Sequence, residues 1–292
     1  MEMRTRILPK MLNSEVEEYL QRNDVIFVPV GTIELHGGYP LDSETVISEA
    51  FALEMAEKCD GLVLTGLQYF YAGATASGRG TVQVSVREGI DYLSAVAKSL
   101  LRQGFKRQIY LSFHGPALMT CGPMVRDFFD ETGVPILYID LSTQMIDNVK
   151  ELMMAAMKED QANAMNEFME MFHGLTVASY DKMGRLADVP LVTGYEHQDP
   201  QTCARFNDIF NMATQSSSVG YYFADVRDHM STIDLADEGA RIRLAKKGRQ
   251  VLSQVVDKMD PNHILSQMDN LTAYIRNVET ERPWVPSAFN NQ

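Results

Sequence analysis

Three acids and a histidine follow an apolar run that has the length of a β-strand. Glu34 and His36 are two residues apart, so in an extended segment their side chains point to the same side. Asp42 and Glu44 come after a Gly-Gly-Tyr-Pro turn that can fold the chain back on itself. A carboxylate beside an imidazole is a donor pair suited to a divalent metal ion. The alternative is a capped loop histidine beside a solvated acid.

A second histidine, His114, stands at the end of another apolar run and is followed by Gly115, which permits close approach of the backbone. A single histidine at a strand end is more often structural. In open α/β sheets, however, ligands bind at the carboxyl ends of the strands. Two such ends that both carry ligand-type residues therefore predict one shared site.

Apolar runs and amphipathic helical patterns alternate in the first half of the chain. Strands are predicted at 25–30, 62–64, 108–113 and 134–139, and helices at 43–59, 88–103 and 119–131. Alternation at this spacing is typical of βαβ units. The sequence therefore predicts one three-layer α/β domain, with a mostly parallel sheet flanked by helices.

The second half of the chain has a different pattern. Seven methionines fall between residues 141 and 172, in a segment that we interpret as a helical excursion. One interpretation is that these methionines fill an irregular core. The other is that the helix packs on another subunit or covers a pocket. A further helix is expected from Asp237. We assign 1–260 to one domain and 261–292 to a polar tail that wraps the surface.

Composition narrows the function classes. The 292 residues include 45% hydrophobic and 22% charged ones, typical of a globular chain, and the formal net charge is −13. Such an acidic chain is repelled by nucleic acid and by anionic membrane surfaces, so we expect neither as a partner. Its cysteines (Cys59, Cys121 and Cys203) form no CxxC pair, and no apolar segment is long enough to span a membrane. These features predict a cytoplasmic protein.

The motifs resemble those of the creatininase (creatinine amidohydrolase) family. The Glu-x-His-Gly motif follows a Val-Pro-Val-Gly strand end, and an acid stands eight residues after the histidine. Residues 78–83 are similar to the family's Phe-Pro-Gly-Thr-Ile-Ser stretch, and residues 113–115 stand where the family has Asn-Gly-His-Gly-Gly-Asn. Weaker similarity continues over 173–192, and the whole resemblance spans about residues 25–256.

The resemblance implies a single α/β domain, often assembled as a hexamer, whose site holds two divalent ions, usually zinc, manganese or iron. Carried over by position, Glu34 and His114 would bind one ion and His36 the other. Glu44 would take the bridging position, with Asp42 as the alternative. We therefore expect one or two divalent ions per chain.

Two positions depart from the family pattern. Pro116 stands where creatininase has an acid of the second metal site, and Ala178 replaces a family glutamate. One ion would then bind tightly and another weakly. Glu196, His197 and Asp199 are candidates for the missing ligand, unless they form only a solvated turn. These changes argue against creatinine as the substrate.

Family position also nominates His173 as the acid that protonates the leaving atom; the alternative is a surface histidine at a helix end. We expect a hydrolase that opens a small polar ring, with a cyclic amide favoured. One alternative is cleavage of a C–C bond in a cyclic diketone such as an oxidised inositol, and another is a metal-free binding protein. The methionine-rich helix and the resemblance together predict a homo-oligomer, with a hexamer favoured over a lidded monomer.

Overall fold

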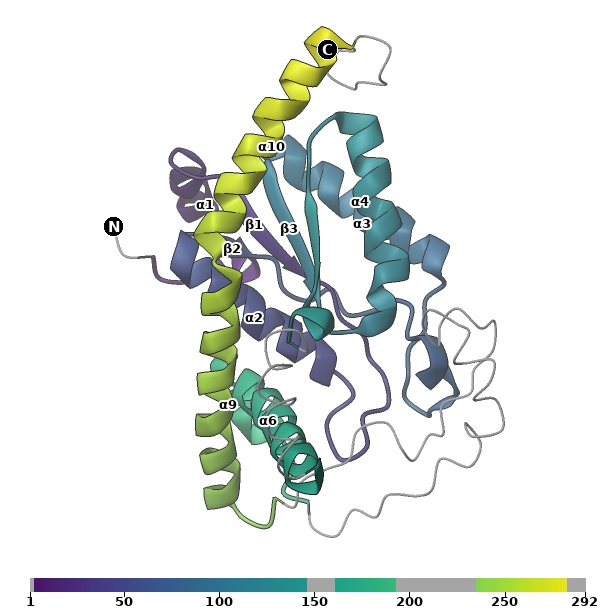
Figure 1. The fold of residues 1–292 in the computed structure, drawn as a ribbon, viewed down its shortest axis with the longest axis vertical. Helices are drawn as coiled ribbons and strands as arrows, with labels where there is room; N and C mark the ends of the chain where they lie inside the picture. Colours follow the sequence, from purple (N-terminus) through teal and green to yellow (C-terminus); the bar gives the residue numbers. More distant parts are fainter. Residues whose placement is uncertain (1–2, 146–160, 193–234, 283–292) are drawn as a thin grey trace.

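The computed structural model describes residues 3–145, 161–192 and 235–282 (Figure 1). In these ranges four strands form one sheet in the order β2-β1-β3-β4, and every pair in it is parallel. The strands are β1 (Val25–Pro29), β2 (Leu62–Val63), β3 (Arg107–Ser112) and β4 (Leu137–Asp140). Each lies within or next to a predicted strand. The prediction of an α/β fold with a parallel sheet flanked by helices is confirmed.

Seven α-helices and four short 3₁₀ turns surround this sheet in the described residues. The helices are α1 (Asn13–Leu20), α2 (Ser43–Cys59), α3 (Val86–Arg102), α4 (Leu118–Thr132), α6 (Gln161–Lys182), α9 (Glu238–Met259) and α10 (Pro261–Glu281). The 3₁₀ turns are η1 (Leu8–Lys10), η2 (Gly73–Ser77), η3 (Gly115–Ala117) and η4 (Leu186–Asp188). Helix α2 has the predicted bounds.

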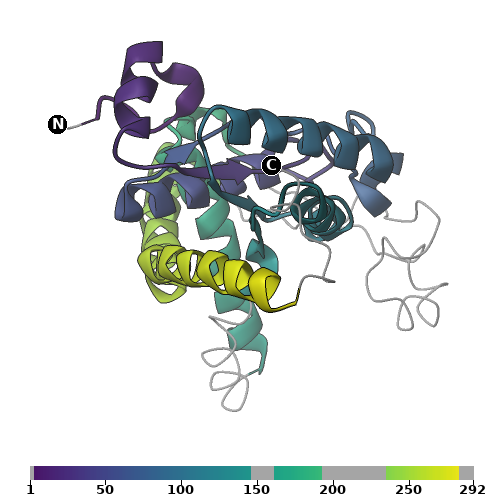
Figure 2. The ribbon, with the colours of Figure 1, turned by 90° about the horizontal axis from the view of Figure 1, so that it is seen from above.

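The sheet is the middle of three layers. Along β1, Ile26 and Val28 pack in one core cluster with α1, α3 and α4, whereas Val25 and Phe27 pack in another with α2, α9 and α10. Figure 2 shows α3 on one side of the sheet and α9 and α10 on the other. Because successive strand residues face opposite sides, a strand covered on both faces is apolar throughout. This explains the continuous apolar run at β1.

Residues 261–281 correct the prediction of a polar tail, because they form helix α10, drawn in yellow in Figure 1. Asp260 has a left-handed φ of 48°, which ends α9, and its side chain accepts a hydrogen bond from the His263 N–H at the start of α10. Leu265 and Met268 are buried in the core cluster that includes α2. Leu265 and Met268, with the partly buried Ile264 beside them, pack this helix against the core, and so few apolar residues are hard to recognise in a polar segment.

The methionine-rich segment is described only in part. Leu141 and Met145 are buried in the core behind the sheet, residues 146–160 lie outside the described ranges, and α6 covers the later portion. The predictions of an oligomer interface and of a lid therefore stay predictions. In the described ranges, none of the helices has the length and apolar character needed to cross a membrane.

Helices α6 and α9 cross at two glycines. A Cβ added to Gly248 would lie 1.8 Å from the carbonyl oxygen of Gly174 and 2.7 Å from the backbone nitrogen of Leu175. Only residues without a side chain allow the two backbones to come so close. This crossing fixes α6, which carries His173, against α9.

Helix α2 carries a buried acid, Glu49, whose Oε1 accepts a hydrogen bond from the backbone N–H of Gly66 at 2.9 Å. Burial raises the pKa of Glu49 above its usual value. An acid with a raised folded-state pKa binds more protons in the folded chain, so its stabilising contribution is lost as pH rises through that pKa. We therefore expect the Tm of Glu49→Gln to increase relative to wild type as the pH rises from about 4, the usual pKa of a glutamate, towards neutral. Thermal unfolding of both proteins over this range checks the prediction, and a constant or shrinking Tm difference would contradict it.

Candidate metal centre

The structure brings together Glu34, His36, Glu44 and His114 at the carboxyl edge of the sheet. Nδ1 of His114 lies 2.9 Å from Oε1 of Glu34 and 2.5 Å from Oε2 of Glu44. Nε2 of His36 lies 3.8 Å from Oε1 of each of the two glutamates. All four residues are buried, and none of them is more than 8% exposed. These four residues are called the cluster below.

The end of β1 and the start of α2 pack closely enough to bring the two glutamates together. A Cβ on Gly31 would lie 2.5 Å from Cα of Thr45, so only glycine fits between the strand end and the helix. Oγ1 of Thr45 donates to the carbonyl oxygen of Thr32 at 2.9 Å, which ties the helix to the loop after the strand. Glu34 and Glu44 each lie next to this junction.

Each cluster histidine donates one ring N–H to a backbone carbonyl. His36 donates from Nδ1 to the carbonyl of Glu34 at 3.0 Å, and His114 donates from Nε2 to the carbonyl of Tyr71 at 2.9 Å. A neutral imidazole has one N–H, so its other nitrogen then presents a lone pair. In both rings that second nitrogen faces the carboxylates of Glu34 and Glu44. Lone pairs that face carboxylate oxygens repel unless a proton or a cation lies between them.

The electrostatics of the cluster favour a positive charge. Burial alone would lower the pKa of His114, but the carboxylates of Glu34 and Glu44 raise it well above its usual value. Burial alone would raise the pKa of Glu44, but His114 and His36 hold it well below its usual range. The group is therefore built to hold ionised carboxylate beside positive charge, which a proton or a metal ion can supply.

The donor set fits a divalent metal ion. Glu34, His36 and Glu44 can each offer one ligand atom, and these atoms lie within 4.8 Å of one another. Histidine nitrogens whose other N–H is held by a carbonyl are the usual form of metal-binding imidazole, because the hydrogen bond fixes both tautomer and ring orientation. Mixed imidazole and carboxylate donors suit zinc, manganese and iron.

Asp42, the alternative to Glu44, points to other partners. Its Oδ1 accepts a hydrogen bond from the Tyr180 hydroxyl at 2.6 Å, and its Oδ2 pairs with Arg185 at 2.7 Å. Tyr180 lies in the last turn of α6 and Arg185 follows that helix, so this acid ties the start of α2 to the end of α6. Glu44 instead lies in the cluster.

We therefore expect Glu44→Gln to weaken metal binding at least about tenfold more than Asp42→Asn, because only Glu44 faces the two histidines. Competition with a coloured chelator measures the metal Kd of each variant. Asp42→Asn is the matched control, since it removes one carboxylate charge two residues away. The reverse ranking would move the ligand to Asp42.

His173 is buried in α6, which contradicts the alternative of a surface histidine at a helix end. Its Nδ1 lies 2.9 Å from the Tyr39 hydroxyl, and the two rings stack with centroids 5.6 Å apart. The backbone N–H of Tyr39 in turn donates to the carbonyl of His36 at 3.1 Å. His173 is thus connected to the loop that carries His36, and its role as an acid stays a prediction.

Neither position that departs from the family pattern offers a ligand to the cluster, and the candidate replacements lie outside the described residues. Pro116 packs against Gly73, where an added Cβ would meet Cγ of the proline at 3.2 Å. Ala178 is buried in α6. The candidate ligands Glu196, His197 and Asp199 fall in 193–234, outside the described ranges, so their proposed role is untested.

Two threonines in contact with the cluster were missed by the sequence analysis. Oγ1 of Thr32 lies 3.1 Å from Oε1 of Glu34 and 3.4 Å from Oε2 of Glu44. The Thr75 hydroxyl, in η2, donates to Oε2 of Glu34. Thr75 follows the predicted strand at 62–64 and so belongs to the same edge of the sheet. Threonine is not a typical metal ligand, and the position of Thr75 in the sequence does not show that it contacts Glu34.

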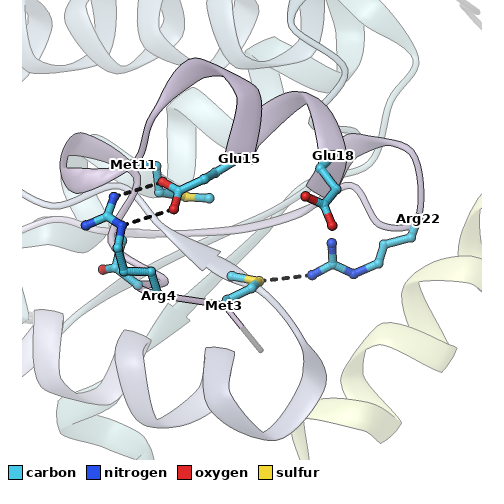
Figure 3. A pocket seen from close by; sticks show the side chains of 7 residues that line it. Met3, Arg4, Met11, Glu15, Glu18 and Arg22 are labelled. Carbon is cyan, nitrogen blue, oxygen red and sulfur yellow. Dashed lines mark hydrogen bonds and ion pairs between the residues drawn. The ribbon is translucent and has the colours of Figure 1, made fainter. Parts of the chain in front are cut away.

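A pocket of about 110 Å³ lies elsewhere, between the N-terminal segment and α1 (Figure 3). Arg4 and Glu15 on its wall form a bidentate pair at 3.0 and 2.8 Å. Arg22, also on the wall, pairs with Asp60 at 3.1 Å. Arg22 precedes β1 in the chain, which places this pocket at the amino edge of the sheet, away from the cluster. Its paired charges indicate a structural role.

Comparison with known sequences gives two matches. The family model of creatininase, described as creatinine amidohydrolase, matches residues 9–177. The 3-dehydro-scyllo-inosose hydrolase of Thermotoga maritima is 34% identical over 107 residues, which are 36% of this chain and 34% of that protein. The matched stretch therefore spans about a third of the length of this relative.

Comparison with solved structures shows the same fold. A crystal structure of creatinine amidohydrolase has a TM-score of 0.56 at 16% identity, and the match covers 88% of this chain and 97% of that one. A tryptophan-to-phenylalanine mutant of creatininase reaches a TM-score of 0.61 at 18% identity, covering 90% and 99%. A putative creatinine amidohydrolase from Bacteroides fragilis gives 0.54 at 19% identity, covering 88% and 94%.

Proposed function

Because this chain belongs to the creatininase family, we propose that it is a divalent-metal-dependent hydrolase that opens a small polar ring. One observation carries the proposal. Both cluster histidines give one N–H to a backbone carbonyl and turn the other nitrogen to the carboxylates of Glu34 and Glu44. This is the orientation in which metal-binding imidazoles are held, and the two carboxylates complete the donor set.

In the proposed site, Glu34 and His114 would hold one ion and His36 the second, with Glu44 as the ligand shared between them. The two oxygens of Glu44 support this assignment, because Oε2 lies beside His114 and Oε1 faces His36. Solved creatininase structures include a manganese form and a zinc–zinc form. We propose zinc, manganese or iron for this chain, with the second ion bound more weakly because Pro116 offers no ligand.

A bound divalent cation lowers the pKa of coordinated water towards 7 and polarises a carbonyl oxygen. The chain itself must supply a proton to the leaving atom, and His173 is the proposed donor. Burial raises the pKa of Tyr39, so its hydroxyl stays protonated and can donate to Nδ1 of His173. Tyr39 engages Nδ1 of His173, as donor to the neutral ring or as acceptor from the imidazolium, and we propose that the imidazolium gives its proton from Nε2.

Two ring chemistries fit this arrangement. In a cyclic amide, water adds to the carbonyl carbon, the C–N bond breaks and the nitrogen takes the proton. In a ring with two carbonyls, water adds to one of them, the adjacent C–C bond breaks and the released carbon takes the proton. Both give a carboxylic acid and need the same proton donor.

From the sequence a cyclic amide is the favoured substrate class, but the Thermotoga relative favours an oxidised inositol. That hydrolase is named for an inositol carrying two carbonyl groups, and it is 34% identical over the matched stretch. The creatininase structures, at 15–19% identity, support the fold alone. We therefore propose the cyclic diketone as the first substrate class and the cyclic amide as the second.

A panel of cyclic diketones, including oxidised inositols, and cyclic amides tests the proposal. Each compound is incubated with zinc- or manganese-loaded protein and with chelator-treated protein, and ring opening is followed as a mass gain of one water. We expect metal-dependent opening of the diketones. Opening of the amides alone would reverse the order of the two classes. No opening, together with no metal retained after purification without chelator, would favour a metal-free binding protein.

A further inference from the structure

We propose that Thr75 is a positioning residue that holds the carboxylate of Glu34 in its metal-binding orientation. The inference rests on the proposed function, because it concerns how tightly the same site holds its ion. It assigns a role to η2, a segment that carries no ligand-type side chain.

The two oxygens of Glu34 have separate partners. Oε1 lies 2.9 Å from Nδ1 of His114, and Oε2 accepts the hydrogen bond from the Thr75 hydroxyl. Thr75 is only 3% exposed, so water does not compete freely for this bond. A carboxylate held at one oxygen keeps the other in place, and the carboxyl group cannot rotate away from the histidine.

The Thr75 hydroxyl has a second acceptor within reach. It lies 3.1 Å from the carbonyl oxygen of Ala72, and because it has one proton it donates to only one of the two. A carboxylate is the stronger acceptor, since hydrogen bonds to ionised groups are about twice as strong as neutral ones. The bond to Glu34 is therefore the favoured one, with the carbonyl of Ala72 as a partner if Glu34 turns.

The same stretch of chain also orients His114. The carbonyl of Tyr71, four residues before Thr75, accepts the N–H of His114 at 2.9 Å and so presents Nδ1 to the cluster. Between these two positions, Gly73 has a left-handed φ of 71° and packs against Pro116. The carbonyl of Thr75 accepts a hydrogen bond from Thr81 at 3.1 Å. The turn at residues 71–75 thus supports two of the four proposed ligands, Glu34 and His114.

The test measures zinc and manganese affinity by chelator competition in wild type and in three variants at position 75. Thr75→Val keeps the shape but removes the donor, Thr75→Ala removes the donor with less bulk, and Thr75→Ser keeps the hydroxyl. The matched control is Thr120→Val, because Thr120 is fully buried and its Oγ1 has no hydrogen-bond partner within the described ranges. The Tm of every protein in chelator shows that each is folded, and the Tm gain on adding metal is a second readout.

We expect Thr75→Val and Thr75→Ala to weaken metal binding about 10–100-fold, the usual effect of removing a partner of a ligand. Thr75→Ser should bind within about threefold of wild type, and Thr120→Val should be unchanged. Wild-type affinity in both non-donor variants would overturn the role of Thr75 while leaving the proposed function intact. Failure of Thr75→Ser to restore binding would overturn it too, because the methyl group would then matter. A wild-type chain that binds no divalent ion would overturn the proposed function itself.

Discussion

His36→Ala and His114→Ala are each expected to lower the metal content of the purified protein and to reduce hydrolysis to background. Each change removes a nitrogen that faces both carboxylates, and the shortened side chain offers no replacement donor. Neither histidine belongs to the apolar clusters that pack the sheet, so the fold should survive. The loss of metal affinity and activity should exceed the loss caused by changing a residue that only supports a ligand, for which about 10–100-fold is usual.

Metal analysis of protein purified without chelator measures the first effect, and the ring-opening assay measures the second. His263→Ala is a suitable control, because His263 is an exposed residue at the start of α10. This variant should keep wild-type metal content and activity. Full metal content or activity in either cluster variant would remove that histidine from the proposed site.

Gly248→Ala is expected to destabilise the fold by about 3 kcal/mol or more, or to prevent folding. The new methyl carbon would lie 1.8 Å from the carbonyl oxygen of Gly174, so the backbones of α6 and α9 would have to separate. A backbone cannot move aside as the end of a side chain can. Because α6 carries His173 and packs Phe172 against Phe113, this separation should also disturb the site.

Gly122→Ala provides the matched control for this prediction. Gly122 is also a helical glycine, but apart from its chain neighbours a Cβ there would meet only Cδ1 of Leu118 at 3.4 Å, an ordinary contact. Alanine should change the stability by no more than about 1 kcal/mol, because its better helix propensity is offset by the contact of its Cβ with the ring of Pro123, the next residue. Chemical unfolding of both variants measures the two free energies. Equal stabilities would show that the α6–α9 crossing tolerates a methyl group.

The sequence by itself determined the sheet, its parallel pairing and three of the four residues of the cluster. Strands covered on both faces must be apolar at every position, so runs such as 25–30 stand out without any knowledge of their neighbours. Glu34, His36 and His114 could be identified for a similar reason, since each follows such a run at the edge where α/β sheets place ligands. Local spacing was enough, because each of these features depends on a single strand and the few residues after it.

Only the tertiary structure decided which acid joins the cluster, what supports it and how the chain ends. Asp42 and Glu44 are two residues apart and have the same chemistry. Which of them joins the cluster depends on α6, because this helix offers Tyr180 to Asp42 and places Arg185 next to it. The contact of Thr75 with Glu34 joins residues 41 apart in the chain, and no local pattern encodes it. Helix α10 forms because α2 and the sheet offer an apolar surface for Leu265 and Met268. Most helical stability comes from such packing and not from propensity, so a polar segment becomes a helix only where the rest of the fold provides a partner.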